Sequence, residues 1–358
     1  MARRAGVICL YLFNMNNTVK FSQIYLFFTA LLVLFSCKQN NRPDVEDIKL
    51  DISIQRFDKD VMAGMTKGLQ QTDQELAKKY GYFYQDYVNR IVGNGDYSGP
   101  EILDVLYKDQ AFKDLNHDAD SVFKNMEPIE KDLSTTFKYI KHYYPKVNIP
   151  RFITFISGFE VQTPIGDGYM GIGLDMFLGR DSRFYPAIAS SVPQYISRRF
   201  TPAYVVPRLA ETFAREELFP ERDEDRTLLA KMIHNGKILY FMDQVLDEQV
   251  PDSVKIGYTD KQLGWCTTYE GNIWGYFMEH ELLFKTDYQK IQVYLSEGPF
   301  TPGLGEKNQS APKLGVWMGW QIVRKYMQEN PDVSLPELMA DTDAEKILRA
   351  SKYKPRQK

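Results

Sequence analysis

Histidine and acidic residues are the first place to look for chemistry in this sequence, which has four histidines. A thermolysin-like zinc site needs two histidines at positions i and i+4 of one helical face, with a glutamate between them as general base. The only His-Glu pair is His280-Glu281, and the residue four positions after His280 is Phe284. His234 is followed by Asn235 and has no second histidine at helical spacing. The sequence therefore predicts no metal site built from histidines.

Nucleophiles and paired carboxylates give no stronger indication of catalysis. A G-x-S-x-G elbow is absent, and the glycine-rich runs 166–168 and 171–173 lack the lysine and the strand-to-helix context of a phosphate loop. No spacing sets Glu211 apart from the many other acids. A cryptic peptidase or peptidoglycan hydrolase stays open as the alternative, with one candidate cluster: Glu270, Glu279, His280 and Glu281. We otherwise predict no catalytic residue, no cofactor and no metal.

Three further features have structural interpretations. Asp175 lies in an apolar run, where burial of a carboxylate is costly unless it is hydrogen-bonded, so we predict a structural hydrogen-bond hub. Cys266, also in an apolar setting, is predicted to be a small buried hydrophobe and not a nucleophile. Aromatic residues at helical spacing favour a core over a groove for glycan or peptide: Trp265, Tyr269, Trp274, Tyr276 and Phe277.

A different chemistry is indicated near the N-terminus, in the run Leu34-Phe35-Ser36-Cys37. Basic Lys20 precedes a mostly apolar segment, 24–35, and the small residue Ser36 stands directly before the cysteine. This is the order of a secretory signal, and the cysteine makes it resemble a bacterial lipoprotein lipobox. The resemblance implies that the Cys37 thiol carries diacylglycerol and that its freed amine carries a third acyl chain. An uncleaved transmembrane anchor is the lesser alternative. The apolar run 24–35 has only about a dozen residues, whereas a helix that crosses a bilayer needs about 20.

These features divide the chain into three parts. Residues 1–36 are predicted to be a signal peptide, with Met15 as an alternative start. Residues 37–47 form the acylated cysteine and a polar tether, and residues 48–358 form a single globular domain. After loss of Cys9 and acylation of Cys37, only Cys266 is free, so core packing must supply the stability that disulfides supply elsewhere.

The charge of the chain excludes one class of partner. The leader contributes three basic residues, Arg3, Arg4 and Lys20, and no acid, so its removal lowers the formal net charge of −3 by three further units. A mildly acidic protein of this kind has no electrostatic reason to bind nucleic acid. The acyl chains must then hold it at a membrane.

The globular part is predicted to be α+β, predominantly helical, with a small antiparallel sheet. Alternating apolar residues predict a strand over 48–56, and β-branched and aromatic runs predict strands over 151–157 and 169–178 that pair as a hairpin. Thr259 and Ser334 are expected helix caps. Apolar residues at three- and four-residue steps predict helices over 72–91, 100–115, 118–144, 193–200, 201–219, 225–246, 260–284, 287–295 and 313–329.

Several runs taken together resemble the GldB family of gliding-motility lipoproteins of Bacteroidetes. They are the lipobox with its short tether, Ile172–Gly179, Leu228–Phe241, Leu263–Trp265 and Lys313–Tyr326. The likeness covers essentially the whole chain after the leader. It implies a membrane-anchored envelope protein that acts as a non-catalytic accessory or scaffold in gliding motility and in the associated type IX secretion machinery, with other envelope proteins as partners.

A more distant resemblance concerns the run Ile233–Lys237. It is similar to the second element of predicted zinc peptidases that carry HExxH, with Asn235 where the metal-binding glutamate would stand. HExxH itself is absent, so the resemblance implies a degenerate zincin-like scaffold without its metal, used for binding. The tether Lys38–Arg42 is basic to neutral, whereas surface-exported lipoproteins of this phylum resemble one another in having acids there. We therefore expect an anchored protein that faces the periplasm.

Overall fold

The computed structural model describes residues 42–222, 224–305 and 309–356. The chain divides into two units, 1–44 and 45–358, and the elements below belong to the second. The predicted leader, Cys37 and the Lys38–Asn41 part of the tether lie outside the described residues. Within the described ranges, no helix combines the length and the apolar character needed to cross a membrane.

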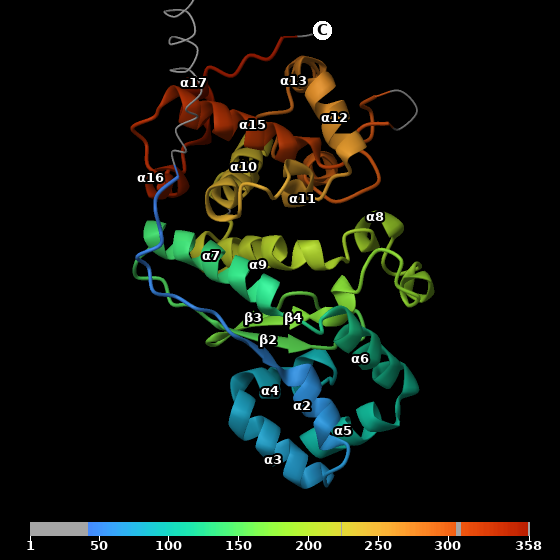
Figure 1. Ribbon diagram of the computed structural model, residues 1–358. Coiled ribbons are helices and arrows are strands. Elements are labelled where there is room, and N and C mark those ends of the chain that lie inside the picture. Colours follow the sequence, from blue (N-terminus) through green and yellow to red (C-terminus); the bar gives the residue numbers. More distant parts are fainter. Residues whose placement is uncertain (1–41, 223, 306–308, 357–358) are drawn as a thin grey trace, which may run out of the picture. The chain divides into compact units, whose positions relative to one another are not determined.

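A four-stranded sheet with the order β1-β2-β4-β3 carries the fold (Figure 1). The strands are β1 (Ile54–Arg56), β2 (Arg151–Phe155), β4 (Tyr169–Gly173) and β3 (Ile165–Gly166). β1, β2 and β4 are parallel, and the short edge strand β3 is antiparallel to β4. The α+β class and the predominance of helix are therefore confirmed, but the sheet is mixed and not antiparallel.

The predicted hairpin is wrong in its partners. β2 and β4 run parallel, with Ile153 opposite Gly171, and the hairpin instead joins β3 to β4. After β2 the chain passes to the sheet edge, forms β3, turns at Gly168 (φ +70°) and returns as β4 between β2 and β3. A direct hairpin needs only a short turn, whereas the connection between parallel strands is longer. The 13 residues that connect β2 to β4 include the strand β3.

The predicted strand over 48–56 is confirmed only at its end, where β1 forms. Before β1 the extended chain lies along α7 (Glu127–Tyr143). The backbone N–H of Ile52 donates to Ser134 Oγ at 2.8 Å, and that of Ile54 donates to Glu130 Oε1 at 2.7 Å. Helix side chains thus satisfy N–H groups that a longer strand would have given to a neighbouring strand.

The first half of the chain forms more and shorter helices than predicted. Gly81 (φ +58°) interrupts the segment expected over 72–91, and Asp109 caps a new helix with its carboxylate on the Ala111 N–H at 2.8 Å. The apolar pattern alone predicts that these helices continue, but a glycine with positive φ and a capping carboxylate end one helix and begin the next. They are α2 (Phe57–Gly64), α3 (Leu69–Tyr80), α4 (Tyr82–Asp86), a π-helical turn η1 (Tyr87–Ile91), α5 (Gly99–Lys108), α6 (Gln110–Val122) and α7.

The second half is almost entirely helical. Thr259 and Ser334 both form capping boxes, as predicted, whereas the helix expected over 260–284 is broken at Tyr269. Short 3-10 turns are η2 (Leu174–Phe177), η3 (Tyr185–Ile188), η4 (Pro202–Tyr204) and η6 (Gln292–Tyr294). The helices are α8 (Gln194–Ser197), α9 (Val205–Phe213) with the π-helical turn η5 (Ala214–Leu218), α10 (Leu228–Val245), α11 (Asp252–Ile256), α12 (Asp260–Thr268), α13 (Glu270–Glu279), α14 (Tyr288–Ile291), α15 (Leu314–Glu329), α16 (Leu335–Ala340) and α17 (Ala344–Ser351).

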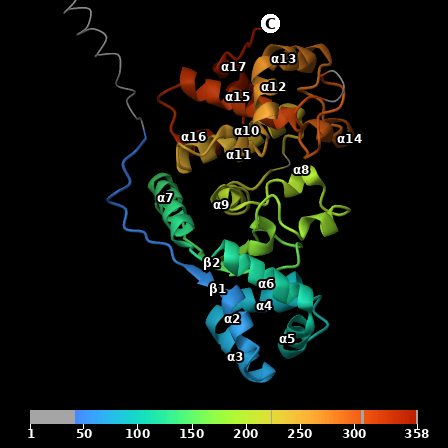
Figure 2. The same cartoon turned by 45° about the vertical axis from the view of Figure 1, so that its right-hand side comes forward.

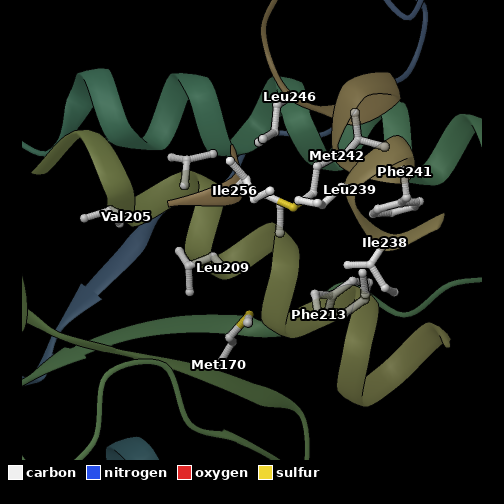
Figure 3. Packing of buried hydrophobic residues seen from close by; sticks show 14 of the residues in the cluster. Met170, Val205, Leu209, Phe213, Ile238, Leu239, Phe241, Met242, Leu246 and Ile256 are labelled. Carbon is white, nitrogen blue, oxygen red and sulfur yellow. The ribbon is translucent and has the colours of Figure 1, made fainter. Parts of the chain in front are cut away.

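Helix α9 lies between the sheet and α10 in both views of the ribbon (Figures 1 and 2). Figure 3 shows Leu209 and Phe213 of α9 with Met170 of β4 on one side and Leu239 and Met242 of α10 on the other. All five side chains are at most 2% exposed. This apolar packing fixes α9, and with it the polar side chains that α9 carries on its other face.

Helices α10 and α15 cross at two glycines. A β-carbon built on Gly236 would lie 2.3 Å from the carbonyl carbon of Gly319, and one built on Gly319 would lie 1.8 Å from the carbonyl oxygen of Met232. Real β-carbons do not approach other atoms so closely, so the two main chains touch at this crossing. The crossing sets the position of α10 and therefore of Asn235, the residue beside Gly236.

Candidate functional site

β2 and β4 are parallel, so their carboxyl-terminal ends lie side by side, and Asp175 follows shortly after β4 at this end of the sheet. Its Oδ2 accepts hydrogen bonds from the Phe159 N–H at 2.7 Å, the Ser157 N–H at 3.1 Å and the Ser157 hydroxyl at 3.1 Å. The side chain is fully buried, and burial raises its pKa to about 6 against the opposing effect of these bonds. The predicted hydrogen-bond hub is confirmed.

The loop that hydrogen-bonds Asp175 contains two consecutive residues with positive φ. Gly158 and Phe159 have φ values of +75° and +71°, and Phe159 is one of few non-glycine residues in the described ranges to do so. A β-carbon makes this region costly, and such strain persists only where surrounding contacts impose it. The carboxylate of Asp175, bound to the two N–H groups of this loop, is that contact.

A second carboxylate, that of Glu211 on α9, is mostly buried and is bound by two arginines. Arg208 donates to Glu211 Oε2, and Arg215 donates to Glu211 Oε1 at 3.0 Å. Burial opposes ionisation of Glu211, but the charges of Arg208 and Arg215 outweigh it and lower the pKa to about 2. Arg215 also donates to Asn235 Oδ1 of α10 at 3.0 Å. We call Arg208, Glu211, Arg215 and Asn235 the ionic cluster.

The ionic cluster bears on the resemblance to zinc peptidases. Glu211 and Arg215 are four residues apart along α9 and η5, and Asn235, where that resemblance places a metal-binding glutamate, lies on the adjacent helix. Two side chains at i and i+4 with a third from another helix is the ligand arrangement of such zinc sites. Here Arg215 donates hydrogen bonds to both Glu211 and Asn235, so these two oxygen-bearing side chains are already bound by a cation of the protein. These residues do not fit a zinc ion.

The loop that binds Asp175 and the helix that carries the ionic cluster are linked by two threonines. The hydroxyls of Thr163, in the loop after β2, and Thr212, on α9, are 2.8 Å apart. Gln162 Oε1 in the same loop accepts from Arg208 Nε at 3.3 Å. The two carboxylate sites therefore share one loop, 157–163.

His234 and Lys237 of the same α10 run line a cavity of about 510 Å³ beside α16. Lys237 Nζ donates to the carbonyl oxygens of Met339 at 3.2 Å and Asp341 at 2.9 Å, at the C-terminal end of α16, where a cation stabilises the helix. Burial lowers the pKa of His234 to about 4, so the imidazole is neutral at neutral pH. Lys237 is therefore a structural residue here.

The candidate hydrolase cluster is not brought together. Glu270 begins α13 and accepts from the Tyr353 hydroxyl at 2.5 Å, whereas Glu279 ends the same helix. At 1.5 Å per residue the two backbones are roughly 13 Å apart. His280 and Glu281 are exposed beyond the helix end. Among the residues that the structure describes, no group of three or more His, Cys, Asp and Glu is arranged to hold a metal ion.

The aromatic residues of α12 and α13 do not form one platform. Their ring partners differ: Trp265 contacts Tyr269, Trp274 contacts Tyr353, and Tyr276 contacts His280, while Phe277 contacts Tyr294. Phe277 is fully buried and Tyr269 is 45% exposed, so the expected core role holds for some of them only. Cys266 is buried and free, as predicted, and burial raises the pKa of its thiol.

Comparison with known proteins gives one match. A family model described as gliding motility protein GldB matches residues 38–355. The chain therefore belongs to the GldB family of gliding motility lipoproteins, which is not a known enzyme family. No curated protein and no solved structure matches the chain.

Sequence reasoning missed most of the ionic cluster. Glu211 did not stand out from other acids, although Arg208 and Arg215 at i−3 and i+4 form a pattern of facing charges on a helix. Asn235 was noticed only through the family of zinc peptidases. Phe159 carried no signal at all, because its positive φ depends on the loop that Asp175 organises.

Proposed function

We propose that this protein is a non-catalytic, lipid-anchored accessory or scaffold protein of the cell envelope, acting in gliding motility and the associated type IX secretion machinery. The ionic cluster is the observation that carries the proposal. Its charged side chains are hydrogen-bonded to one another, and one of its members, Asn235, belongs to the run that resembles an element of zinc peptidases. A site whose carboxylate is already neutralised by two arginines has no free base to offer a substrate.

The anchor is Cys37, acylated after removal of the leader, and the tether that follows holds the domain close to the bilayer. Ten residues of random coil span about 15–20 Å. The basic-to-neutral run Lys38–Arg42 favours retention at the periplasmic side. A protein held there without chemistry of its own acts through contact with other envelope proteins.

Complementation of a deletion strain tests the proposal in an organism that glides. We expect the deletion to abolish gliding, the unaltered gene to restore it, and Cys37→Ala to fail because the product carries no lipid anchor. Ser36→Ala keeps a small residue before the cysteine and is the matched control that should restore gliding. A deletion strain that glides normally would contradict the motility role.

Metal analysis of the purified protein tests the non-catalytic part separately. We expect no stoichiometric zinc, because Arg215 stands between Glu211 and Asn235. One bound zinc per chain would overturn the proposal and favour an envelope hydrolase.

A further inference from the structure

A cleft of about 310 Å³ opens beside the ionic cluster, between the loop after β2, the segment around α8 and the start of α9. One wall is apolar and includes Phe159, Met176, Ile196 and Phe200. Two arginines, Arg199 and Arg208, also line the cleft. Ligand sites have volumes of roughly 300–1,000 Å³, so this cleft has room for a small group only.

Both guanidinium groups have donors to spare. Arg199 uses Nη1, which donates to Glu297 Oε1 at 2.9 Å. Arg208 uses Nε and Nη1, on Gln162 and Glu211. Within the described residues, Nη2 of Arg199 and Nη2 of Arg208 have no hydrogen-bond partner. Each guanidinium therefore keeps one NH₂ group that its present hydrogen bonds do not use.

The charges around the cleft are unbalanced toward positive. Glu297 is shared by Arg199 and Lys313, whose Nζ is 2.5 Å from the same Oε1. Glu211 is shared by Arg208 and Arg215. Two carboxylates beside the cleft are thus shared by four cations, and the acid among the lining residues, Glu160, is exposed. In an otherwise acidic protein, this local excess attracts an anion.

We propose that the cleft binds the C-terminal carboxylate of a peptide whose last side chain is apolar. The planar donors of Arg199 and Arg208 match a carboxylate, and the apolar wall receives the side chain beside it. A phosphate ion matches the donors equally well but makes no use of Phe159, Met176 or Ile196. The inference rests on the proposed function in one respect, since a scaffold would use this cleft to hold the end of a partner protein.

Titration of the full-length protein in detergent with one peptide in two forms tests the cleft. The probe is acetyl-Ala-Leu-Phe as the free acid and as the C-terminal amide, followed by calorimetry. We expect the acid to bind about ten-fold or more tightly than the amide, as loss of a charge-assisted hydrogen bond predicts. Equal affinity of the two forms, or no binding of the acid at millimolar concentration, would overturn the proposal.

Variants locate the site. Arg208→Gln and Arg199→Gln should each weaken binding of the acid about ten-fold, whereas Arg183→Gln, whose side chain is 61% exposed and paired with Asp118, should not change it. Because the first two also lose an internal ion pair, Ile196→Trp fills the cleft without touching a charge and should abolish binding. Retained binding in Ile196→Trp would contradict the assignment.

Inorganic phosphate is the second probe. Phosphate that binds as tightly as the peptide acid would show that the apolar wall contributes nothing and would overturn the peptide proposal. Failure of the titration would contradict the peptide site but not the role in gliding. A deletion strain that still glides would contradict the role in gliding but not the peptide site. The two proposals can therefore fail separately.

Discussion

Asp175 is fully buried and Glu211, a short loop away, is mostly buried, with 16% of its side chain exposed. Their surroundings shift the pKa values of the two carboxylates in opposite directions. Asp175 is held by two backbone N–H groups and a hydroxyl, and burial raises its pKa to about 6. Glu211 is held by two arginines, and its pKa is lowered to about 2. Hydrogen-bond donors alone do not offset the loss of water around Asp175, whereas full charges more than offset it around Glu211.

The difference separates two structural roles. Asp175 organises a strained loop, and its charge is incidental to that role because a neutral acceptor of the same shape could make the bonds. Glu211 contributes through its negative charge. Without that charge, the guanidinium groups of Arg208 and Arg215 would lose the carboxylate that they share. Substitutions that keep shape and remove charge should distinguish the two sites.

Glu211→Gln should have the largest effect. The variant leaves Arg208 and Arg215 without their shared anion, and we expect a loss of about 2–4 kcal/mol in the free energy of unfolding, below the range for a fully buried pair because Arg208 is partly exposed. Urea denaturation followed by circular dichroism measures it. Glu345→Gln, which removes an exposed partner of Arg349, is the control and should change stability by less than about 0.5 kcal/mol. Equal losses in the two variants would refute the comparison.

At Asp175, shape should matter more than charge. Asp175→Ala leaves the N–H groups of Ser157 and Phe159 unsatisfied, and we expect a loss of about 2–3 kcal/mol. Asp175→Asn keeps an acceptor oxygen in place and should lose less than about 1 kcal/mol at pH 7. The same urea titration applies. A loss for Asp175→Asn as large as that for Glu211→Gln would mean that the charge of Asp175 is essential after all.

The pH dependence should differ in sign. The folded-state pKa of Asp175 lies above its unfolded value, so ionisation costs stability as pH rises from about 4 through 6. Glu211 has a folded-state pKa below its unfolded value, and its contribution is already complete at pH 5. Between pH 5 and pH 7, wild type should therefore lose about 1 kcal/mol relative to Asp175→Asn. Urea midpoints of both proteins at pH 5, 6 and 7 measure it, and a constant difference would refute the assigned shift.

The smallest effect is expected at the hydroxyl pair that joins the two sites. Thr212→Val removes the hydrogen bond to Thr163 and should cost about 0.5–1.5 kcal/mol. Combination with Asp175→Asn gives a double-mutant cycle, since Thr163 and the Asp175 loop belong to one segment. We expect a coupling energy near zero if the two carboxylate sites are independent. A large coupling energy would show that the shared loop transmits changes between them.

The sequence indicated the kinds of elements well and their partners poorly. The apolar run of α10 and the helix caps at Thr259 and Ser334 are local features, and the structure has them where they were expected. The parallel pairing of β1 with β2 joins residues far apart in the chain, such as Ile54 and Phe152, and no local pattern specifies it. Breaks such as that at Gly81 were missed because apolar periodicity continues across them.

The same distinction applies to the site. Burial of Asp175 could be predicted because its neighbours in the chain are apolar, and a buried carboxylate needs hydrogen bonds. The pairing of Arg215 with Asn235 brings together two helices, and the cleft at Arg199 and Arg208 assembles from several separate segments. These groupings depend on how α9 and α10 pack and are not written in any one stretch of sequence.

The touching main chains at Gly236 and Gly319 offer a criterion for kinship. Any side chain at either position would have to push α10 and α15 apart, and we expect this shift to disturb the bond between Arg215 and the neighbouring Asn235. A distant relative that keeps this interior must therefore keep both glycines, and a sequence that has lost one should have rebuilt its charged interior as well. We expect this glycine pair to separate true members from chance matches where overall identity is too low to decide.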